Sequence, residues 1–251
     1  IIAHQTFVSC GQMKKSTTEN KRPLRETSVR ILDAAEQLFA AQSYEGTSIR
    51  QITDLAEVRL ALAHYHFESK EQIFFEVLAR RANVVNESRQ KLLTHYRSAR
   101  GQSPLSVEDI ARCYISPYLY WSLHGGPGWQ NYAKLAARIM STERWMELLS
   151  NLFNPLAQAF LHELRRTFPG REEQRIQWAF DFMVGVMSNT FSENNRIVGL
   201  SNGLCSSENH EDACNHLLPF VVAGVSATVD SATASFTNDF DTILQASTLN
   251  D

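Results

Sequence analysis

The chain has 251 residues, with 24 Lys and Arg against 27 Asp and Glu, and a formal net charge of −3. This length allows one large core, or a small domain followed by a larger one, and the near-neutral charge alone does not suggest a nucleic-acid-binding protein. The four cysteines show no C-x-x-C pair and no metal-ligand spacing, so we expect reduced, mostly unreactive thiols. No apolar run approaches the length of a membrane span and no secretory signal precedes the first helical pattern. We therefore expect a cytoplasmic protein with no membrane partner.

Residues 1–24 predict a flexible N-terminal arm. Met13, followed by KKSTTENKRP, looks like a natural start, so we expect residues 1–12 to lie upstream of the native protein. Basic residues outnumber acidic ones from the arm into the first helix, at Lys14, Lys15, Lys21, Arg22, Arg25 and Arg30. Such a run suits contact with a phosphate backbone or a minor groove. A solvated tail without a DNA role is the alternative.

The pattern after residue 25 is helical, with short interruptions. One face of a first helix is formed by Ile31, Leu32, Ala35, Leu38 and Phe39. Thr47 and Ser48 are suited to capping a short second helix, because their side chains can accept from backbone N–H groups. Residues 56–58 form a turn, and a third helix is expected from about Val58 to His66.

The third helix has two different faces. At 100° per residue, one face carries Leu60, Ala61, His64 and Tyr65, while the other carries Leu62, Ala63 and His66. The first combination is poor core material. It suits a helix in a DNA major groove, where apolar groups meet thymine methyls and polar tips reach bases or phosphates.

Residues 25–82 resemble the DNA-binding domain of the tetracycline-repressor (TetR) family of bacterial transcription regulators. The resemblance is carried by ETSVRILDAAEQLFAAQSYEGTS, by T-S-I-R-Q-I-T and by the closing H-Y-H-F-E-S-K. It implies an all-α fold, in which a three-helix DNA-binding domain (25–82) is joined by a long helix to a helical ligand-binding and dimerisation domain (83–228). It also implies a ligand-responsive, non-enzymatic regulator of bacterial transcription. We expect a repressor that binds a palindromic DNA operator as a homodimer, in the cytoplasm and at the nucleoid when bound.

The resemblance also implies roles for individual residues. Thr47 or Ser48 would donate to a phosphate, the Tyr65 hydroxyl would contact phosphate, and Lys70 would clamp one, whereas Leu60 and Ala61 would read bases. The full set expected at the DNA is Thr47, Ser48, Arg50, Arg59, Leu60, Ala61, His64, Tyr65, His66 and Lys70.

Several of these assignments have alternatives. Arg59 suits either a guanine edge or a phosphate, and Arg50 could equally bridge helices. Tyr65 and His66 could be packing residues. A metal site at His64 and His66 is disfavoured, because positions two apart diverge on a helix. Glu57 departs from the family pattern, since a turn glycine is usual there; the turn must avoid a positive φ or bear strain, and the carboxylate adds negative charge near the DNA.

The rest of the chain predicts further helices. A long fourth helix follows Ser69, and others are expected over 106–123, 129–140, 142–168, 171–198 and 211–228. Residues 229–251 are rich in Ser, Thr, Asn and Asp and predict a loosely held tail.

The helix expected over 171–198 is apolar on two sides. One stripe consists of Ile176, Ala179, Phe180, Met183, Met187 and Thr190, and the second of Trp178, Phe182, Gly185 and Asn189. A helix with two such stripes needs two partners, and a second subunit can supply one of them. The second stripe, together with Phe220 and Gly224 of the last helix, therefore predicts a dimer interface. Burial within one subunit is the alternative.

The segment CYISPYLYWSL gives the clearest indication of a ligand cavity, because Pro117 should kink its helix. The expected lining is Tyr114, Tyr118, Trp121, Trp129, Phe153, Met183 and Met187, although such residues also form ordinary cores. No cluster of charged groups indicates an ionic ligand, metal or cofactor, so the expected effector is an unidentified apolar or aromatic small molecule. Its binding would shift the dimer away from the operator by differential affinity.

Two other classes of function are weighed against this one. The first is a structural or co-regulatory DNA-binding dimer without a small-molecule effector. The second is an all-helical enzyme, but the sequence has no nucleophile–base spacing, glycine-rich phosphate loop or metal cluster to support it. We therefore expect no enzymatic activity and no cofactor.

Overall fold

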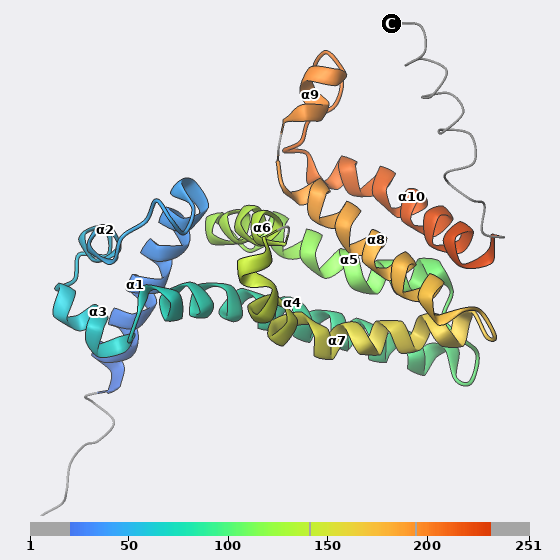
Figure 1. The fold of residues 1–251 in the computed structure, drawn as a ribbon, viewed down its shortest axis with the longest axis horizontal. Helices are drawn as coiled ribbons and strands as arrows, with labels where there is room; N and C mark the ends of the chain where they lie inside the picture. Colours follow the sequence, from blue (N-terminus) through green and yellow to red (C-terminus); the bar gives the residue numbers. More distant parts are fainter. Residues whose placement is uncertain (1–20, 141, 194, 232–251) are drawn as a thin grey trace, which may run out of the picture. The chain divides into compact units, whose positions relative to one another are not determined.

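The computed structural model describes residues 21–140, 142–193 and 195–231, which form helices and turns and no strand. This is the predicted all-α fold (Figure 1). In chain order the helices are α1 (Lys21–Gln42), α2 (Ile49–Leu55), α3 (Leu60–His66), α4 (Lys70–Arg100), α5 (Val107–His124), α6 (Pro127–Ile139), the 3₁₀ turn η1 (Glu143–Trp145), α7 (Met146–Thr167), α8 (Glu173–Phe191), α9 (Arg196–Leu200) and α10 (His210–Asp230).

The chain divides into two compact units, Ile1–Leu78 and Ala79–Asp251. We call their described parts the head and the bundle. The division falls inside α4, four residues before the domain boundary that the sequence suggested. One continuous helix therefore belongs to both units.

The head has an apolar core built around α1 and the first turns of α4. Phe39 and Phe74 are fully buried, and their rings meet edge to face with centroids 5.1 Å apart. Tyr44, in the turn after α1, contacts both rings. Ile52 of α2 and Ala63 of α3 are buried as well. The aromatic contacts join α1 and the turn after it to α4.

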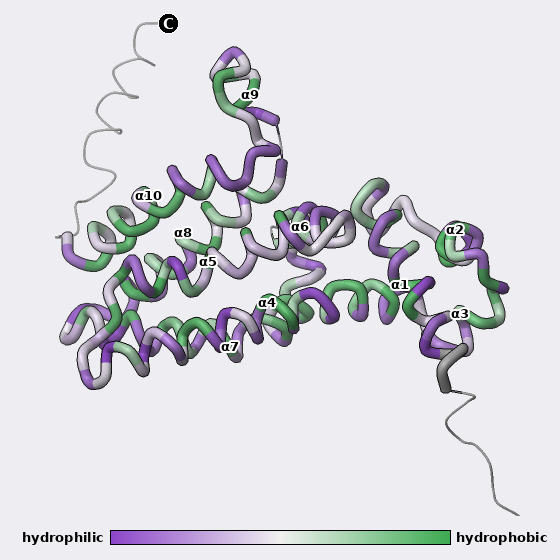
Figure 2. Tube along the Cα trace, turned by 180° about the vertical axis from the view of Figure 1, so that it is seen from behind, coloured by the Kyte–Doolittle hydropathy of each residue, from purple (hydrophilic) through white to green (hydrophobic). Residues whose placement is uncertain are grey.

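The bundle is built from helices that pack in pairs. α8 packs on α10, α6 and α7, and α5 packs on α10, α7 and α6. The apolar stripe predicted along α8 (Ile176, Ala179, Phe180, Met183, Met187) is buried, apart from the half-buried Thr190 at its end. The second half of α10 is largely hydrophobic (Figure 2). Pro117 lies within α5, which continues unbroken to His124.

Some helix bounds differ from those predicted. The helix expected over 171–198 ends at Phe191, and Glu193 and Asn195 have positive φ values of 49° and 57°. A short helix, α9, follows over Arg196–Leu200, and its last two residues extend past the expected helix end at 198. The sequence did not predict the end of α8 at this point, because the polar residues after Phe191 include no proline or glycine that would mark a helix end. The helix expected over 142–168 is divided into η1 and α7.

The two ends differ in a similar way. α1 begins at Lys21, so residues 21–24 of the expected arm are helical, and α10 extends to Asp230, two residues into the expected tail. The predictions for residues 1–20, including the start at Met13, and for residues 232–251 lie outside the described residues. Among the described helices, none combines the length and apolar character needed to cross a membrane.

Candidate DNA-binding head and ligand cavity

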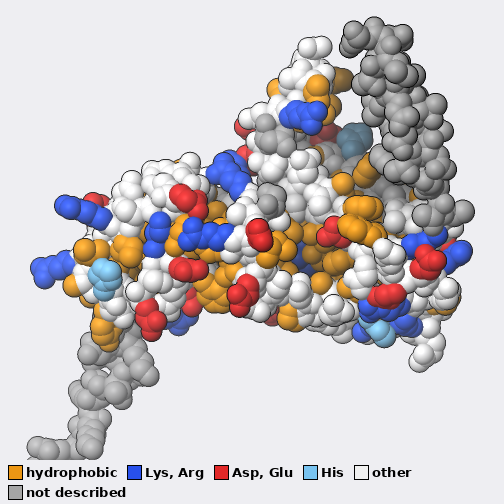
Figure 3. All heavy atoms as spheres, in the orientation of Figure 1, with side chains coloured by type: hydrophobic (Ala, Val, Ile, Leu, Met, Phe, Trp, Pro, Cys, Tyr) orange, Lys and Arg blue, Asp and Glu red, His pale blue; other side chains and the backbone are white. Residues whose placement is uncertain are grey.

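The exposed face of α3 is the one that the sequence predicted. Leu60, Ala61, His64 and Tyr65 are all exposed, and Tyr65 retains 70% of its accessible surface. Ala63, on the opposite face, is buried. Histidine and basic side chains project from the part of the head that carries α3 (Figure 3). A short helix thus presents a mixed apolar and polar face, which is the type of surface that reads a major groove.

The start of α2 is fixed by a capping box. The Ser48 side chain accepts from the backbone N–H of Gln51, and the Gln51 side chain accepts from the backbone N–H of Ser48. Thr47 is placed differently from its predicted role, because only 2% of it is exposed and its hydroxyl donates to the Ser43 carbonyl at 2.8 Å. Of the two residues proposed for a phosphate contact, only Ser48 is accessible.

Lys70 has partners within the head itself. Its ammonium donates to the carbonyl oxygens of Tyr44 and Thr47, each at 2.9 Å, and lies 4.1 Å from the centroid of the Tyr44 ring. The side chain thereby joins the start of α4 to the turn before α2. In this arrangement Lys70 braces the head, and the phosphate contact expected of it stays a prediction.

His66 is turned away from the exposed face. It is half-buried, and its Nε2 is buried without a hydrogen-bond partner among the described residues. Its ring lies 5.3 Å from that of Tyr65 and 6.1 Å from that of Phe67. The predicted DNA contact of His66 therefore does not fit its position, whereas packing does.

The turn between α2 and α3 has a positive φ at Glu57, the strained one of the two alternatives that the sequence left open. Glu57 has a φ of 53°, a conformation unfavourable for a side chain with a Cβ. Its carbonyl oxygen accepts from Arg30 Nη2 at 2.8 Å, so α1 supports the turn. Arg50 and Arg59 are exposed beside it, and DNA contact by either stays a prediction.

The bundle contains a cavity of about 220 Å³. Four of the seven predicted lining residues lie on it: Tyr114, Tyr118, Phe153 and Met187. Further apolar walls come from Met140, Met146, Leu149 and Phe180. Burial raises the pKa of Tyr118 well above its ordinary value, so its hydroxyl stays neutral. This hydroxyl donates to the Ala133 carbonyl at 3.4 Å.

Trp121, Trp129 and Met183 do not line this cavity. The rings of Trp121 and Trp129 stack with centroids 4.8 Å apart, and Trp121 Nε1 donates to Ser88 Oγ at 3.1 Å. The pair fills the corner between α5 and α6, where a Cβ on Gly125 would collide with Trp129. Met183 instead borders a groove between α8 and α10.

The sequence reasoning missed Arg89, a cavity residue on α4. Only 1% of it is exposed, and Nε donates to the Tyr114 carbonyl at 2.8 Å. Nη1 is 3.5 Å from Asn86 Oδ1 and Nη2 is 3.7 Å from Met187 Sδ. A signal was present, since Arg89 occupies a core position in the stripe of buried residues Leu78, Ala82, Val85 and Leu93.

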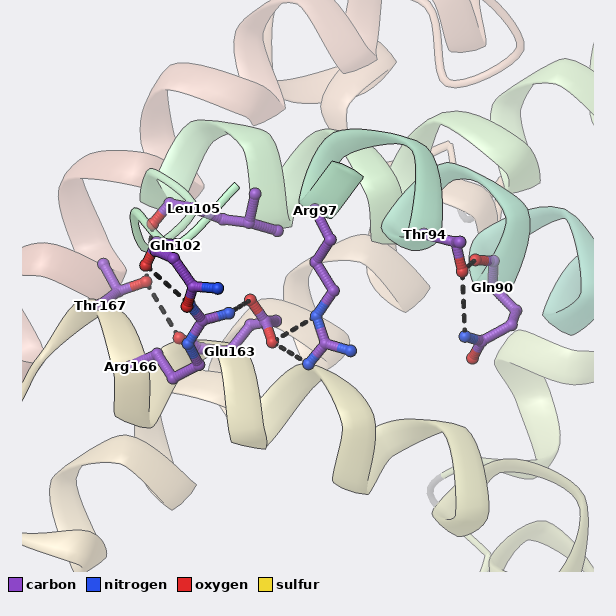
Figure 4. A network of polar contacts seen from close by, with 8 residues as sticks. All are labelled: Gln90, Thr94, Arg97, Gln102, Leu105, Glu163, Arg166 and Thr167. Atoms are coloured by element: carbon purple, nitrogen blue, oxygen red, sulfur yellow. Dashed lines mark hydrogen bonds and ion pairs between the residues drawn. The ribbon is translucent and has the colours of Figure 1, made fainter. Parts of the chain in front are cut away.

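A second buried charge of the bundle, the carboxylate of Glu163, is paired with arginines (Figure 4). Glu163 of α7 is 0% exposed, and its carboxylate accepts from Arg97 of α4 and from Arg166 Nη1, the latter at 3.3 Å. Arg166 Nη2 also donates to the Gln102 carbonyl at 3.1 Å, and Thr167 donates to the Leu105 carbonyl at 2.7 Å. Glu163 is therefore neutralised by its neighbours and serves the fold.

The α8–α10 groove carries the residues predicted for dimerisation. All six are exposed, namely Trp178, Phe182, Gly185, Asn189, Phe220 and Gly224. Four of them line the groove, which measures about 400 Å³, and the Trp178 ring stacks on Phe182 at 5.5 Å. Hydrophobic side chains gather over this part of the bundle (Figure 3). A cluster of exposed aromatic residues is typical of a protein–protein interface.

Two family comparisons cover more than half of the chain. Residues 31–77 match the family described as bacterial regulatory proteins, tetR family, and residues 112–224 match the tetracyclin repressor-like C-terminal domain. The chain belongs to the TetR family. This TetR-family protein is accordingly a DNA-binding transcription regulator and not an enzyme. A search of curated proteins found no match to it.

Solved structures of TetR-family proteins share its fold. One is a protein from Shewanella sp. PV-4 assigned to this family of transcription regulators, with 19% identity, a TM-score of 0.53, and 77% of this chain and 97% of that one covered. A regulatory protein from Rhodococcus RHA1 has 15% identity, a TM-score of 0.51, and covers 79% and 96%. A linker-substituted mutant of HlyIIR has 20% identity, a TM-score of 0.51, and covers 83% and 100%. At these identities the likeness shows the fold alone.

Proposed function

We propose that this TetR-family regulator represses transcription by binding a palindromic operator as a homodimer, and that a small effector in the bundle cavity releases it. The observation that carries the proposal is the exposed face of α3, held on a head whose turns are braced from behind by Lys70 and Arg30. We place this activity in the bacterial cytoplasm, at the nucleoid when the operator is bound.

Base reading is assigned to Leu60 and Ala61, with His64 and Arg59 beside them. The Tyr65 hydroxyl is assigned to phosphate, because it is exposed and can donate a hydrogen bond. Ser48 is assigned to phosphate because it is exposed, and its hydroxyl would exchange its bond to Gln51 Oε1 for one to the phosphate. Arg50 is the further basic candidate on α2. Thr47, His66 and Lys70 are assigned to the support of the head.

The dimer is supported by the exposed aromatic residues of α8 and α10. Trp178, Phe182 and Phe220 would lose their contact with water against a second copy, and Gly185 and Gly224 leave space for close approach of helices. One recognition helix reads few base pairs, so a symmetric pair on a palindrome multiplies the discrimination.

Release is proposed to work through α4. This helix contributes Phe74 and Val77 to the core of the head and Arg89 to the cavity wall. An effector with unequal affinity for the two DNA-binding states of the dimer shifts the population toward the state that it prefers.

Selection of bound DNA from a random pool tests the DNA-binding part of the proposal. We expect an inverted repeat whose half-sites are about one helical turn apart. Leu60→Ala should change the preferred bases within each half-site, whereas Tyr65→Phe should weaken binding to all sequences alike. A single non-repeated site would contradict the homodimer, and a uniform loss of affinity for Leu60→Ala would contradict base reading.

Operator release tests the effector. A ligand that raises the thermal midpoint of the protein should also lower its affinity for the selected operator. Ligands that bind without altering DNA affinity would favour the alternative, a structural or co-regulatory DNA-binding dimer.

A further inference from the structure

We propose that the bundle cavity recognises a small aromatic monocarboxylate through Arg89. This inference rests on the proposed function in taking the cavity as the effector site, and it narrows the expected effector from an apolar or aromatic molecule to an aromatic anion.

Arg89 has no counter-charge among the described residues. Arg89 is 1% exposed, yet it forms no ion pair with any carboxylate among the described residues. A guanidinium keeps its charge and has five N–H donors. Only the Nε contact is a short bond, and the other two acceptors are a distant amide oxygen and a thioether sulfur. Burying such a cation is costly unless an anion neutralises it.

The guanidinium of Arg89 is held in place by its neighbours. The carbonyl of Tyr114 fixes Nε, and the guanidinium carbon lies 3.8 Å from the centroid of the same tyrosine's ring. Asn86, whose oxygen faces Nη1, is itself fixed because its amide donates to the Leu152 carbonyl at 2.8 Å. The remaining Nη donors are therefore pre-oriented on a residue that lines the cavity, and a planar carboxylate can accept from both.

The size and lining of the cavity suit a single aromatic ring that carries one carboxylate. Its walls include the rings of Tyr114, Phe153 and Phe180, with methionines beside them. A volume near 220 Å³ exceeds that of a cavity known to take benzene, and scaling by volume gives room for about nine non-hydrogen atoms. Benzoate has this size. Asp181 also lines the cavity but is exposed, so it marks the mouth, where its charge disfavours a second carboxylate.

Glu163 provides the contrast within the same bundle. Its buried charge is neutralised by Arg97 and Arg166 and borders no part of the cavity. The protein itself therefore supplies the counter-charges of Glu163. Arg89 is a buried charge that lines an open cavity, and its partner is assigned to the ligand.

The test uses the full chain and three matched probes: benzoate, its neutral isostere benzamide, and phenyl phosphate. Binding is measured by isothermal titration calorimetry. We expect wild-type protein to bind benzoate at least tenfold more tightly than benzamide. Arg89→Met should abolish this preference, and Arg89→Lys should retain part of it, because the charge remains without the bidentate geometry. Ala157→Phe, which fills the cavity, should weaken all three probes together.

Several results would overturn the inference: equal affinity for benzoate and benzamide, undiminished benzoate binding by Arg89→Met, or no benzoate binding at all. Tighter binding of phenyl phosphate than of benzoate would replace the carboxylate by a phosphate monoester.

Operator binding separates this inference from the proposed function. If benzoate binds through Arg89 but does not release the operator, the anion site stands and control by an effector is refuted. If only neutral ligands release the operator, control by an effector stands and the anion site is refuted. Operator binding by Arg89→Met, measured in parallel, shows that this variant is folded.

Discussion

At the scale of single residues, the two buried charges of the bundle differ in whether a counter-charge lies beside them. Arg89 lacks an anion, so replacing it by an apolar side chain of similar length removes a desolvation cost. Glu163 depends on Arg97 and Arg166, so removing one guanidinium leaves a buried carboxylate partly unpaired. The sequence shows both charges but not which of them is paired.

We expect Arg89→Met to leave the free energy of unfolding unchanged or to raise it. Arg97→Met should lower it by about 1–2 kcal/mol, less than for a fully buried pair, because Arg97 is partly exposed and Arg166 remains. Urea denaturation of both variants checks this. A large loss of stability in Arg89→Met, with Arg97→Met unaffected, would reverse the assignment.

Lys70 gives a second prediction at this scale. Because its ammonium is bonded to the Tyr44 and Thr47 carbonyls, Lys70→Ala should lower the thermal midpoint and weaken DNA binding while leaving the salt dependence nearly unchanged. Arg59→Ala is the matched control, since this arginine is exposed. It should leave the midpoint unchanged and, if it contacts phosphate, reduce the slope of log K against log salt by about 1. A reduced slope for Lys70→Ala would restore the phosphate clamp.

At the scale of helices, one ionic cluster joins the middle of α6, the turn after α8 and the start of α10. Lys134 Nζ lies 2.7 Å from Glu193 Oε2, and the buried His210 Nε2 lies 3.4 Å from Glu193 Oε1. Burial lowers the pKa of His210 below its ordinary 6.5; Lys134 adds to this, whereas Glu193 and Glu208 oppose it. The histidine is thus held mainly in its neutral form at the start of α10.

This cluster predicts a pH dependence. Below pH 6.5 the unfolded chain binds more protons at His210 than the folded chain does, so the free energy of unfolding falls as the pH drops from 6.5 toward the folded-state pKa. Above 6.5 the effect vanishes. His210→Gln should reduce this slope in urea titrations, and His216→Gln, on the exposed side of α10, should not. An identical slope in wild type and His210→Gln would exclude this residue as the cause.

The helices also show what sequence reasoning can reach. The faces of α3 and α8 follow from a 3.6-residue period, because burial is set by direction around the axis. The end of α8 was missed because Glu193 and Asn195 adopt positive φ without a glycine. The contacts of Lys70 and Arg89 could not be predicted from spacing. Lys70 donates to two backbone carbonyls, and Arg89 is buried with no carboxylate beside it among the described residues. A helical period specifies the direction of a side chain but neither of these surroundings.

At the scale of the whole molecule, dimerisation is the property to test. Phe182→Glu combined with Phe220→Glu should yield a monomer by sedimentation velocity, because charges would be buried against the partner. Operator affinity should fall by more than tenfold, since each monomer would contact only one half-site. Tyr120→Glu is the control, an exposed aromatic on α5 that should leave both properties intact. A dimeric double variant would place the interface elsewhere.

The division of the chain inside α4 has a consequence for its backbone. In an α-helix each amide donates to the carbonyl four residues earlier, so hydrogen bonds span the point between Leu78 and Ala79. Neither unit can open at this helix without breaking bonds that also belong to the other. Deuterium uptake by the amides of residues 75–85 should therefore slow when the cavity is occupied, although those in the first part of this stretch belong to the head. The continuity of one helix thus makes local opening a shared property of both units.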